Sequence, residues 1–200
     1  MIDCKTSIYI LQYEIIIFYY IDQMNLKSRC RSDLSTFQDF VNKSLYNLEQ
    51  VAIKLIETGK SLPAQISSCK ETALIIASMY NLPTVCNKLI ETNNCSPDHV
   101  NSQGETALIL TCYYGFETIA NKLVELTEYH LGSIDGTSNT ALILACKRKL
   151  ETVANKIIET GKKSKYECNH THVNKSGKTA LSYAIENGLD SVVLQLGQLN

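Results

Sequence analysis

The chain has 200 residues, of which 44% are hydrophobic and 20% are charged, so it can bury a sizeable core. Its formal net charge is −1 and its pI is about 6.4, which excludes the basic surface expected of a protein that binds nucleic acid or anionic lipid. Its eight cysteines are expected to be reduced thiols of a cytosolic-type compartment, because several of them recur at equivalent places in the pattern described below.

Residues 1–35 are the least informative part of the sequence. Residues 7–21 are apolar, β-branched and aromatic, but Gln12 and Glu14 interrupt the run. The run is shorter than the about 20 apolar residues that span a bilayer, and it lacks the flanks of a signal peptide. We expect a strand or helix that packs on the open end of the following array, with a membrane anchor as the alternative. Residues 27–35 are polar and typical of a linker.

The rest of the chain repeats itself. The phrase Thr-Ala-Leu-Ile begins at Thr72, Thr106 and Thr140, with 34 residues between copies, and Thr-Ala-Leu-Ser begins at Thr179, 39 residues later. A second phrase, typified by Val-Ala-Asn-Lys-Ile-Ile-Glu-Thr, follows at a constant offset. Its copies begin at Val51, Val85, Ile119 and Val153. Self-similarity at a period of about 20–50 residues predicts a solenoid.

Each full unit is expected to hold a turn followed by two helices. Ala107, Leu108 and Leu110 have helical spacing, and Gly115 can end their helix in a left-handed conformation. The second helix carries an apolar stripe that it can bury only against neighbouring units. The expected helices are residues 72–80, 83–92, 106–114, 117–127, 140–148, 151–160, 179–187 and 189–197.

These observations predict an all-α solenoid of stacked helix-turn-helix units over residues 36–200. A degenerate first unit would occupy residues 36–66. Further units would follow at 67–100, 101–134 and 135–173, and a C-terminal unit at 174–200 would serve as a cap.

The repeated phrases resemble the ankyrin repeat. The resemblance rests on Gly-x-Thr-x-Leu, an Ala five residues after the Thr, a Gly or Asn, and a Val-x-x-Lys-Leu-Ile helix. Two family positions differ: the usual Pro is Ala73, Ala107, Ala141 and Ala180, and the usual His is Ile75, Ile109, Ile143 and Ser182. These units look like the ankyrin proteins of giant DNA viruses of the mimivirus type, and the excess of Ile, Asn, Lys and Tyr fits such an AT-rich genome. An AT-rich protist or intracellular bacterium would leave the same imprint.

No motif predicts catalysis. Ser176-Gly177-Lys178-Thr179 matches the end of a Walker A motif, but His172 stands where its upstream glycine is required. No zinc-protease motif and no Cys-x-x-Cys occurs. We therefore expect no enzyme, no cofactor and no small-molecule substrate.

A weak candidate metal site lies in the longest linker. Cys168, His170 and His172 alternate, so in an extended segment they would share one face. Cys and His are zinc ligand types, but no fourth ligand stands nearby. A variable polar loop is the favoured interpretation.

The ankyrin resemblance implies protein binding by the concave face and the turn tips. Repeat register aligns Met79-Tyr80, Tyr113-Tyr114 and Lys147-Arg148 near the ends of the first helices. Tyr and Arg often anchor interfaces, although the tyrosines could equally cover neighbouring helices. The candidate partner-binding residues are Met79, Tyr80, Ser102, Gln103, Glu105, Tyr113, Tyr114, Lys147 and Arg148.

The sequence thus predicts a cytoplasmic, non-catalytic interaction scaffold for a host or viral protein, in the host cell cytoplasm if the source is viral. The alternative is an adaptor tethered to a membrane or to degradation machinery through residues 1–35.

Overall fold

We describe a computed structural model of the chain, in which the described residues are 49–54, 56–57, 66, 70–80, 82–127, 130–163 and 168–199. The chain divides into two compact units, Met1–Pro63 and Ala64–Asn200. In the first unit, residues 49–54 and 56–57 are helical, at the early copy of the second phrase. The expected N-terminal segment 1–35 and most of the degenerate repeat 36–66 lie outside the described residues.

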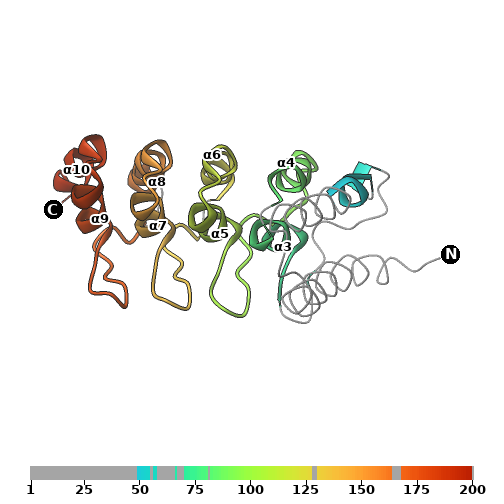
Figure 1. The fold of residues 1–200 in the computed structure, drawn as a ribbon, viewed down its shortest axis with the longest axis horizontal. Helices are drawn as coiled ribbons and strands as arrows, with labels where there is room; N and C mark the ends of the chain where they lie inside the picture. Colours follow the sequence, from blue (N-terminus) through green and yellow to red (C-terminus); the bar gives the residue numbers. More distant parts are fainter. Residues whose placement is uncertain are drawn as a thin grey trace, which may run out of the picture. The chain divides into compact units, whose positions relative to one another are not determined.

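The second unit is a row of antiparallel helix pairs in two layers (Figure 1). One layer holds α3 (Ala73–Met79), α5 (Ala107–Tyr114), α7 (Ala141–Lys147) and α9 (Ala180–Asn187). The other holds α4 (Pro83–Glu91), α6 (Glu117–Leu126), α8 (Glu151–Lys163) and α10 (Asp190–Gly197). The predicted all-α solenoid is confirmed, and among the described residues the only β structure is two isolated bridges, Ile66–Thr72 and Ile134–Thr140.

Every helix of the first layer begins at the threonine of the repeated phrase. The hydroxyl oxygens of Thr72, Thr106 and Thr140 accept hydrogen bonds from the backbone N–H three residues later, at 3.2–3.3 Å. At Thr179 the Ser182 hydroxyl also accepts from the Thr179 backbone N–H, which completes a capping box. The threonine recurs because it satisfies a backbone donor that the first helical turn leaves unpaired.

The helices α5, α7 and α9 are each followed by a left-handed residue at one repeat position. Gly115 has φ of 82° and Gly188 has φ of 68°, while Lys149 takes the same conformation with φ of 62°. A lysine is strained there, because its Cβ crowds the following carbonyl and glycine has no Cβ. All three residues are therefore helix terminators, as the sequence predicts for this position.

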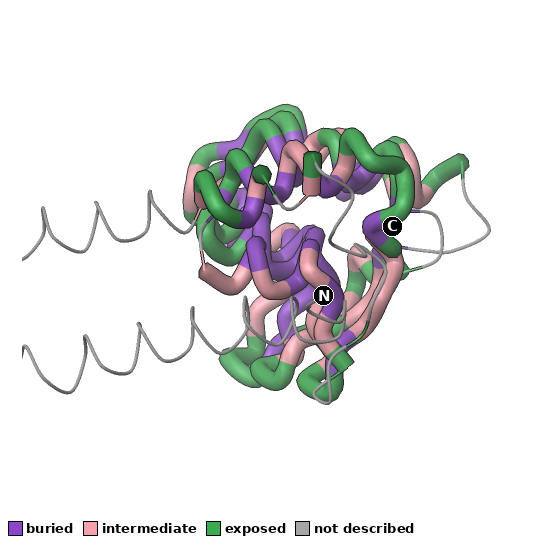
Figure 2. The backbone as a smooth tube through the Cα atoms, turned by 90° about the vertical axis from the view of Figure 1, so that its right-hand side faces the viewer, coloured by how far each residue is buried: buried purple, intermediate pink, exposed green. Residues whose placement is uncertain are grey.

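Buried residues lie between the two layers (Figure 2). Leu74, Leu108 and Leu142 occupy equivalent places and are 0–1% exposed, as predicted. The expectation that Leu181 is equally buried is wrong: it is half-buried, because within the described residues α9 has a first-layer neighbour, α7, on one side only.

Cys112 and Cys146 are buried free thiols at equivalent places in α5 and α7, as predicted. Burial raises the pKa of Cys146 from its ordinary value of 9.0 to about 12, because desolvation disfavours the thiolate. The pKa of Cys112 is raised still further by burial and, secondarily, by the neighbouring Cys146.

Polar side chains of the second layer join successive repeats. The Lys122 ammonium donates to the Asn87 amide oxygen at 2.9 Å, and the Asn155 amide donates to the Ser191 hydroxyl at 2.7 Å. These outward positions therefore contribute to repeat stacking.

Two apolar side chains of the unit at residues 174–200 are largely exposed. Ile185 is 62% exposed and Leu194 is 65% exposed. Cys146, the register equivalent of Ile185, is completely buried beneath the following repeat. Ile185 is therefore exposed at a position that is buried in the internal repeats.

Candidate functional site

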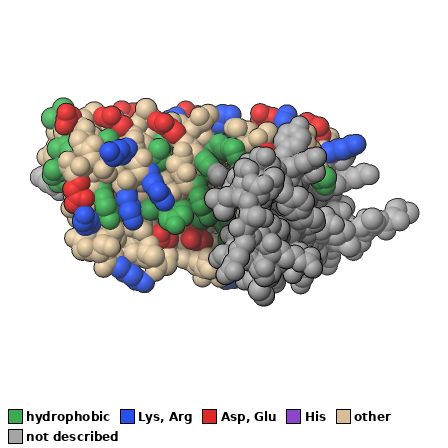
Figure 3. Space-filling view, in the orientation of Figure 1, with side chains coloured by type: hydrophobic (Ala, Val, Ile, Leu, Met, Phe, Trp, Pro, Cys, Tyr) green, Lys and Arg blue, Asp and Glu red, His purple; other side chains and the backbone are tan. Residues whose placement is uncertain are grey.

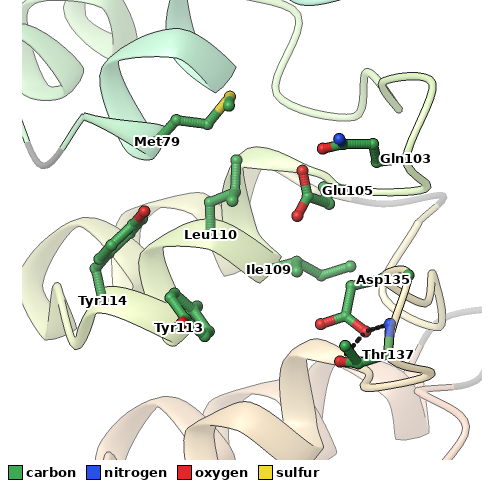
Figure 4. Close-up of a pocket in the computed structure, with 10 residues that line it drawn as sticks. Met79, Gln103, Glu105, Ile109, Leu110, Tyr113, Tyr114, Asp135 and Thr137 are labelled. Carbon is green, nitrogen blue, oxygen red and sulfur yellow. Dashed lines mark hydrogen bonds between the residues drawn. The ribbon is translucent and has the colours of Figure 1, made fainter. Parts of the chain in front are cut away.

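A concavity on the second unit lies beside α5 and has a volume of about 450 Å³. Its walls come from α3, from α5 and from the turns that precede α5 and α7 (Figure 4). The lining residues are Met79, Gln103, Glu105, Ile109, Leu110, Tyr113, Tyr114, Asp135, Gly136 and Thr137. We call this concavity the α5 pocket.

Several of the residues proposed from repeat register lie together in this pocket. Met79, Tyr113 and Tyr114 form its wall away from the turns, and Gln103 and Glu105 form part of the turn side. Tyr113 and Tyr114 are 46% and 44% exposed. Their rings meet edge to face with centroids 5.0 Å apart, so the two aromatic side chains hold each other in place.

The other proposed residues lie outside the pocket lining. Tyr80 is half-buried at the end of α3, and Ser102 is exposed at the tip of a turn. Lys147 and Arg148 are exposed at the end of α7. The register argument therefore places its residues in two groups, one inside the pocket and one beside it.

Positive charge lies beside the tyrosines, in the next repeat along the array. The Arg148 guanidinium lies over the Tyr113 ring, 5.0 Å from its centroid. Lys147 and Lys178 approach the ring of Tyr183 at 5.8 and 5.1 Å. Figure 3 shows Lys and Arg side chains among hydrophobic ones on the part of this face that carries α7 and α9. Cation–π contacts of this kind hold the charges over the surface without neutralising them.

One of these cations already has an acidic partner. The Lys178 ammonium forms an ion pair with the Glu186 carboxylate at 2.7 Å. Hydrogen bonding to Glu186 raises the pKa of this lysine. No ion pair of Lys147 or Arg148 occurs among the described residues, so no carboxylate there offsets the charge of these two side chains.

Two carboxylates occupy the turn side of the pocket. Asp135 organises its own turn: its Oδ1 accepts from the backbone N–H groups of Thr137 and Asn139, both at 2.8 Å. Glu105 accepts one hydrogen bond at Oε2 from the Asn101 amide, at 3.0 Å. In Figure 4 the Glu105 and Asp135 side chains lie on either side of Ile109. The pocket therefore has an acidic side facing an aromatic side.

The sequence argument missed the wall contributed by Asp135, Gly136 and Thr137. The repeat register does indicate this wall, because Thr137 stands three residues before Thr140, as Gln103 stands three residues before Thr106. The sequence argument did not consider that the turn before α7 also lines the pocket beside α5, in the preceding repeat.

The structure does not bring the weak metal candidates together. Cys168 is buried, and its side chain packs closely against Gly161 of α8. The His172 ring lies 3.0 Å from the Ser138 carbonyl oxygen of the preceding repeat. Where residues are described, no group of three or more His, Cys, Asp or Glu side chains could hold a metal ion.

His172 instead belongs to a repeated link between turns. The His99 ring lies 2.7 Å from the Lys70 carbonyl oxygen. His99 and His172 each stand seven residues before a repeat threonine, and their acceptors each stand two residues before the preceding one. These histidines therefore connect adjacent turns, although the family position for such a histidine is Ile or Ser in this chain.

In the described part of the chain, no helix combines the length and the apolarity needed to cross a membrane.

Comparison with known families matches residues 74–165 to the model for ankyrin repeats (3 copies). The stacked helix pairs and capped turns described above agree with this match. These residues form ankyrin repeats. No curated protein matches the chain. Ankyrin repeats generally mediate protein–protein interaction and are typically not enzymes.

Proposed function

We propose that this ankyrin array binds a protein partner through a surface made of the α5 pocket and the adjoining cations Lys147 and Arg148, and that it catalyses no reaction. The observation that carries the proposal is the exposure of Tyr113 and Tyr114 at the pocket wall. Two large aromatic side chains left nearly half exposed on one face are typical of a partner site.

The charge distribution supports the same surface. Acidic side chains line the pocket, and the basic side chains of Lys147 and Arg148 follow in the next repeat. Such a bipolar pattern selects partners by complementarity and disfavours partners with the opposite order of charge.

We further propose that the partner is a host or viral protein and that the array works in the cytoplasm, in the host cell cytoplasm for a viral source. The support is compositional: the repeats look like those of giant DNA viruses, and the cysteine usage is typical of a reducing compartment. An adaptor tethered to a membrane or to degradation machinery through residues 1–35 is the second candidate, favoured by the apolar run at residues 7–21. Flotation of the full chain with liposomes tests the membrane tether.

The main proposal is tested by affinity capture from host cells with quantitative mass spectrometry. The full chain is compared with the double variant Tyr114→Ala/Arg148→Glu and with the control Glu159→Lys. Glu159 is exposed on α8, in the other helix layer. Proteins captured by the wild type and the control but lost with the double variant support the proposal. Capture that survives in the double variant contradicts it.

A further inference from the structure

We infer that the α5 pocket receives an arginine or lysine side chain of an extended partner segment, and that an acidic residue about five positions away in that segment pairs with Arg148. This inference rests on the proposed protein-binding function and specifies the chemistry of its partner.

The pocket fits an organic cation. Its ten lining residues include two carboxylates and no Lys or Arg. Tyr113, Tyr114 and Met79 can pack along the aliphatic part of a basic side chain, while Glu105 meets its charged end. Aromatic rings also attract cations directly.

A metal ion fits the pocket less well. Glu105 and Asp135 belong to no group of three or more metal-binding side chains among the described residues. Both carboxylates already accept hydrogen bonds from amides, which hold them at the pocket side as fixed acceptors. A long side chain with an apolar stem and a charged end uses both sides of the pocket.

The spacing of the motif follows from the array. Arg148 belongs to the repeat after that of Glu105, and packed helices lie roughly 8–10 Å apart. Glu105 precedes the start of α5 whereas Arg148 follows the end of α7, so the two sites are also offset along the helix axis by roughly 13 Å. The two offsets combine to roughly 16 Å, and an extended segment advances roughly 3.3 Å per residue, so about five residues bridge the two sites. The Arg148 guanidinium is held over Tyr113 at the edge of the pocket, where the acidic residue of the partner would arrive.

The first test is selection of peptides from an unbiased display library on the full chain. We expect enriched peptides to combine Arg or Lys with Asp or Glu about five positions apart. Enrichment of peptides without a basic residue, or of none at all, overturns the inference. If peptides with another pattern are enriched and lose binding in Tyr114→Ala, the inference fails while the proposed function stands.

The second test measures affinities of synthetic peptides by fluorescence anisotropy. Glu105→Gln keeps an oxygen to accept from Asn101 and removes the charge, so the turn is preserved. It should weaken binding of the basic peptide by about tenfold, because a charge-assisted contact becomes a neutral one. It should leave a matched peptide with norleucine at the basic position unchanged. Equal affinity of wild type and Glu105→Gln for the basic peptide overturns the inference.

A charge exchange tests the second contact. Arg148→Glu should weaken binding of the peptide with an acidic residue and restore it when that residue is replaced by Lys. Absence of this rescue overturns the proposed pairing. Competition by millimolar methylguanidinium or tetramethylammonium that matches the peptide would identify a small-cation site and contradict a segment as the occupant.

Discussion

The Arg148 guanidinium lies over the ring of Tyr113, 5.0 Å from its centroid, and the two residues belong to neighbouring repeats. The contact links the aromatic wall of the α5 pocket to the basic end of α7. Tyr113 nevertheless remains 46% exposed. Tyr113 and Tyr114 therefore pack on each other, and Tyr113 also packs on a neighbouring cation. Nearly half of the surface of each tyrosine stays available to a partner.

We predict that Tyr114→Ala changes the free energy of unfolding by less than about 1 kcal/mol, because the lost contacts are exposed aromatic pairs. Tyr114 is 44% exposed and contacts Tyr113 and Phe116. Chemical denaturation measures the change. A loss of the size expected for a core leucine would make Tyr114 a packing residue.

We predict that Leu108→Ala lowers the free energy of unfolding by about 2–5 kcal/mol, since it leaves a cavity between the helix layers. Leu108 is 1% exposed in α5, six residues before Tyr114. The same denaturation experiment compares the two variants directly. A change near zero for Leu108→Ala would mean that the repeat register is wrong.

We predict that Lys149→Gly stabilises the array by about 0.5–1 kcal/mol, because glycine removes left-handed strain at the end of α7 at some cost in chain entropy. Lys149 is exposed and has φ of 62°, and Gly115 and Gly188 hold the equivalent positions. Lys147→Gly, inside the same helix, is the matched control and should destabilise. Destabilisation by both changes would contradict the assigned role of residue 149.

Repeat register predicted most of the fold but only part of the site. Thr106 and Leu108 could be placed from sequence, because each copy of the phrase meets the same local environment. The half-buried Leu181 could not, because its burial depends on what lies on the far side of α9. Asp135 was missed because it reaches the pocket of the preceding repeat. Register indicates equivalent positions within units, whereas the pocket is built between them.

We predict that stability falls as the pH rises above about 9. Burial raises the pKa of Cys146 from 9.0 to about 12, so between these values the unfolded chain releases a thiol proton that the folded chain retains. The unfolded state is thereby favoured, by roughly 1 kcal/mol per buried thiol at pH 10. Denaturation of wild type and Cys146→Ala at pH 7 and pH 10 measures this. If the variant loses as much stability as the wild type between the two pH values, Cys146 is not the source of the effect.

The location of the binding surface is tested most directly by hydroxyl-radical footprinting of the chain with and without its captured partner. Tyr113 and Tyr114 should be modified severalfold more slowly in the complex, because a partner in the α5 pocket covers them. Leu126 on α6 and Leu194 on α10 are 41% and 65% exposed and should be modified at unchanged rates. Protection of Leu126 or Leu194 with no change at Tyr113 and Tyr114 would place the partner elsewhere and contradict the account.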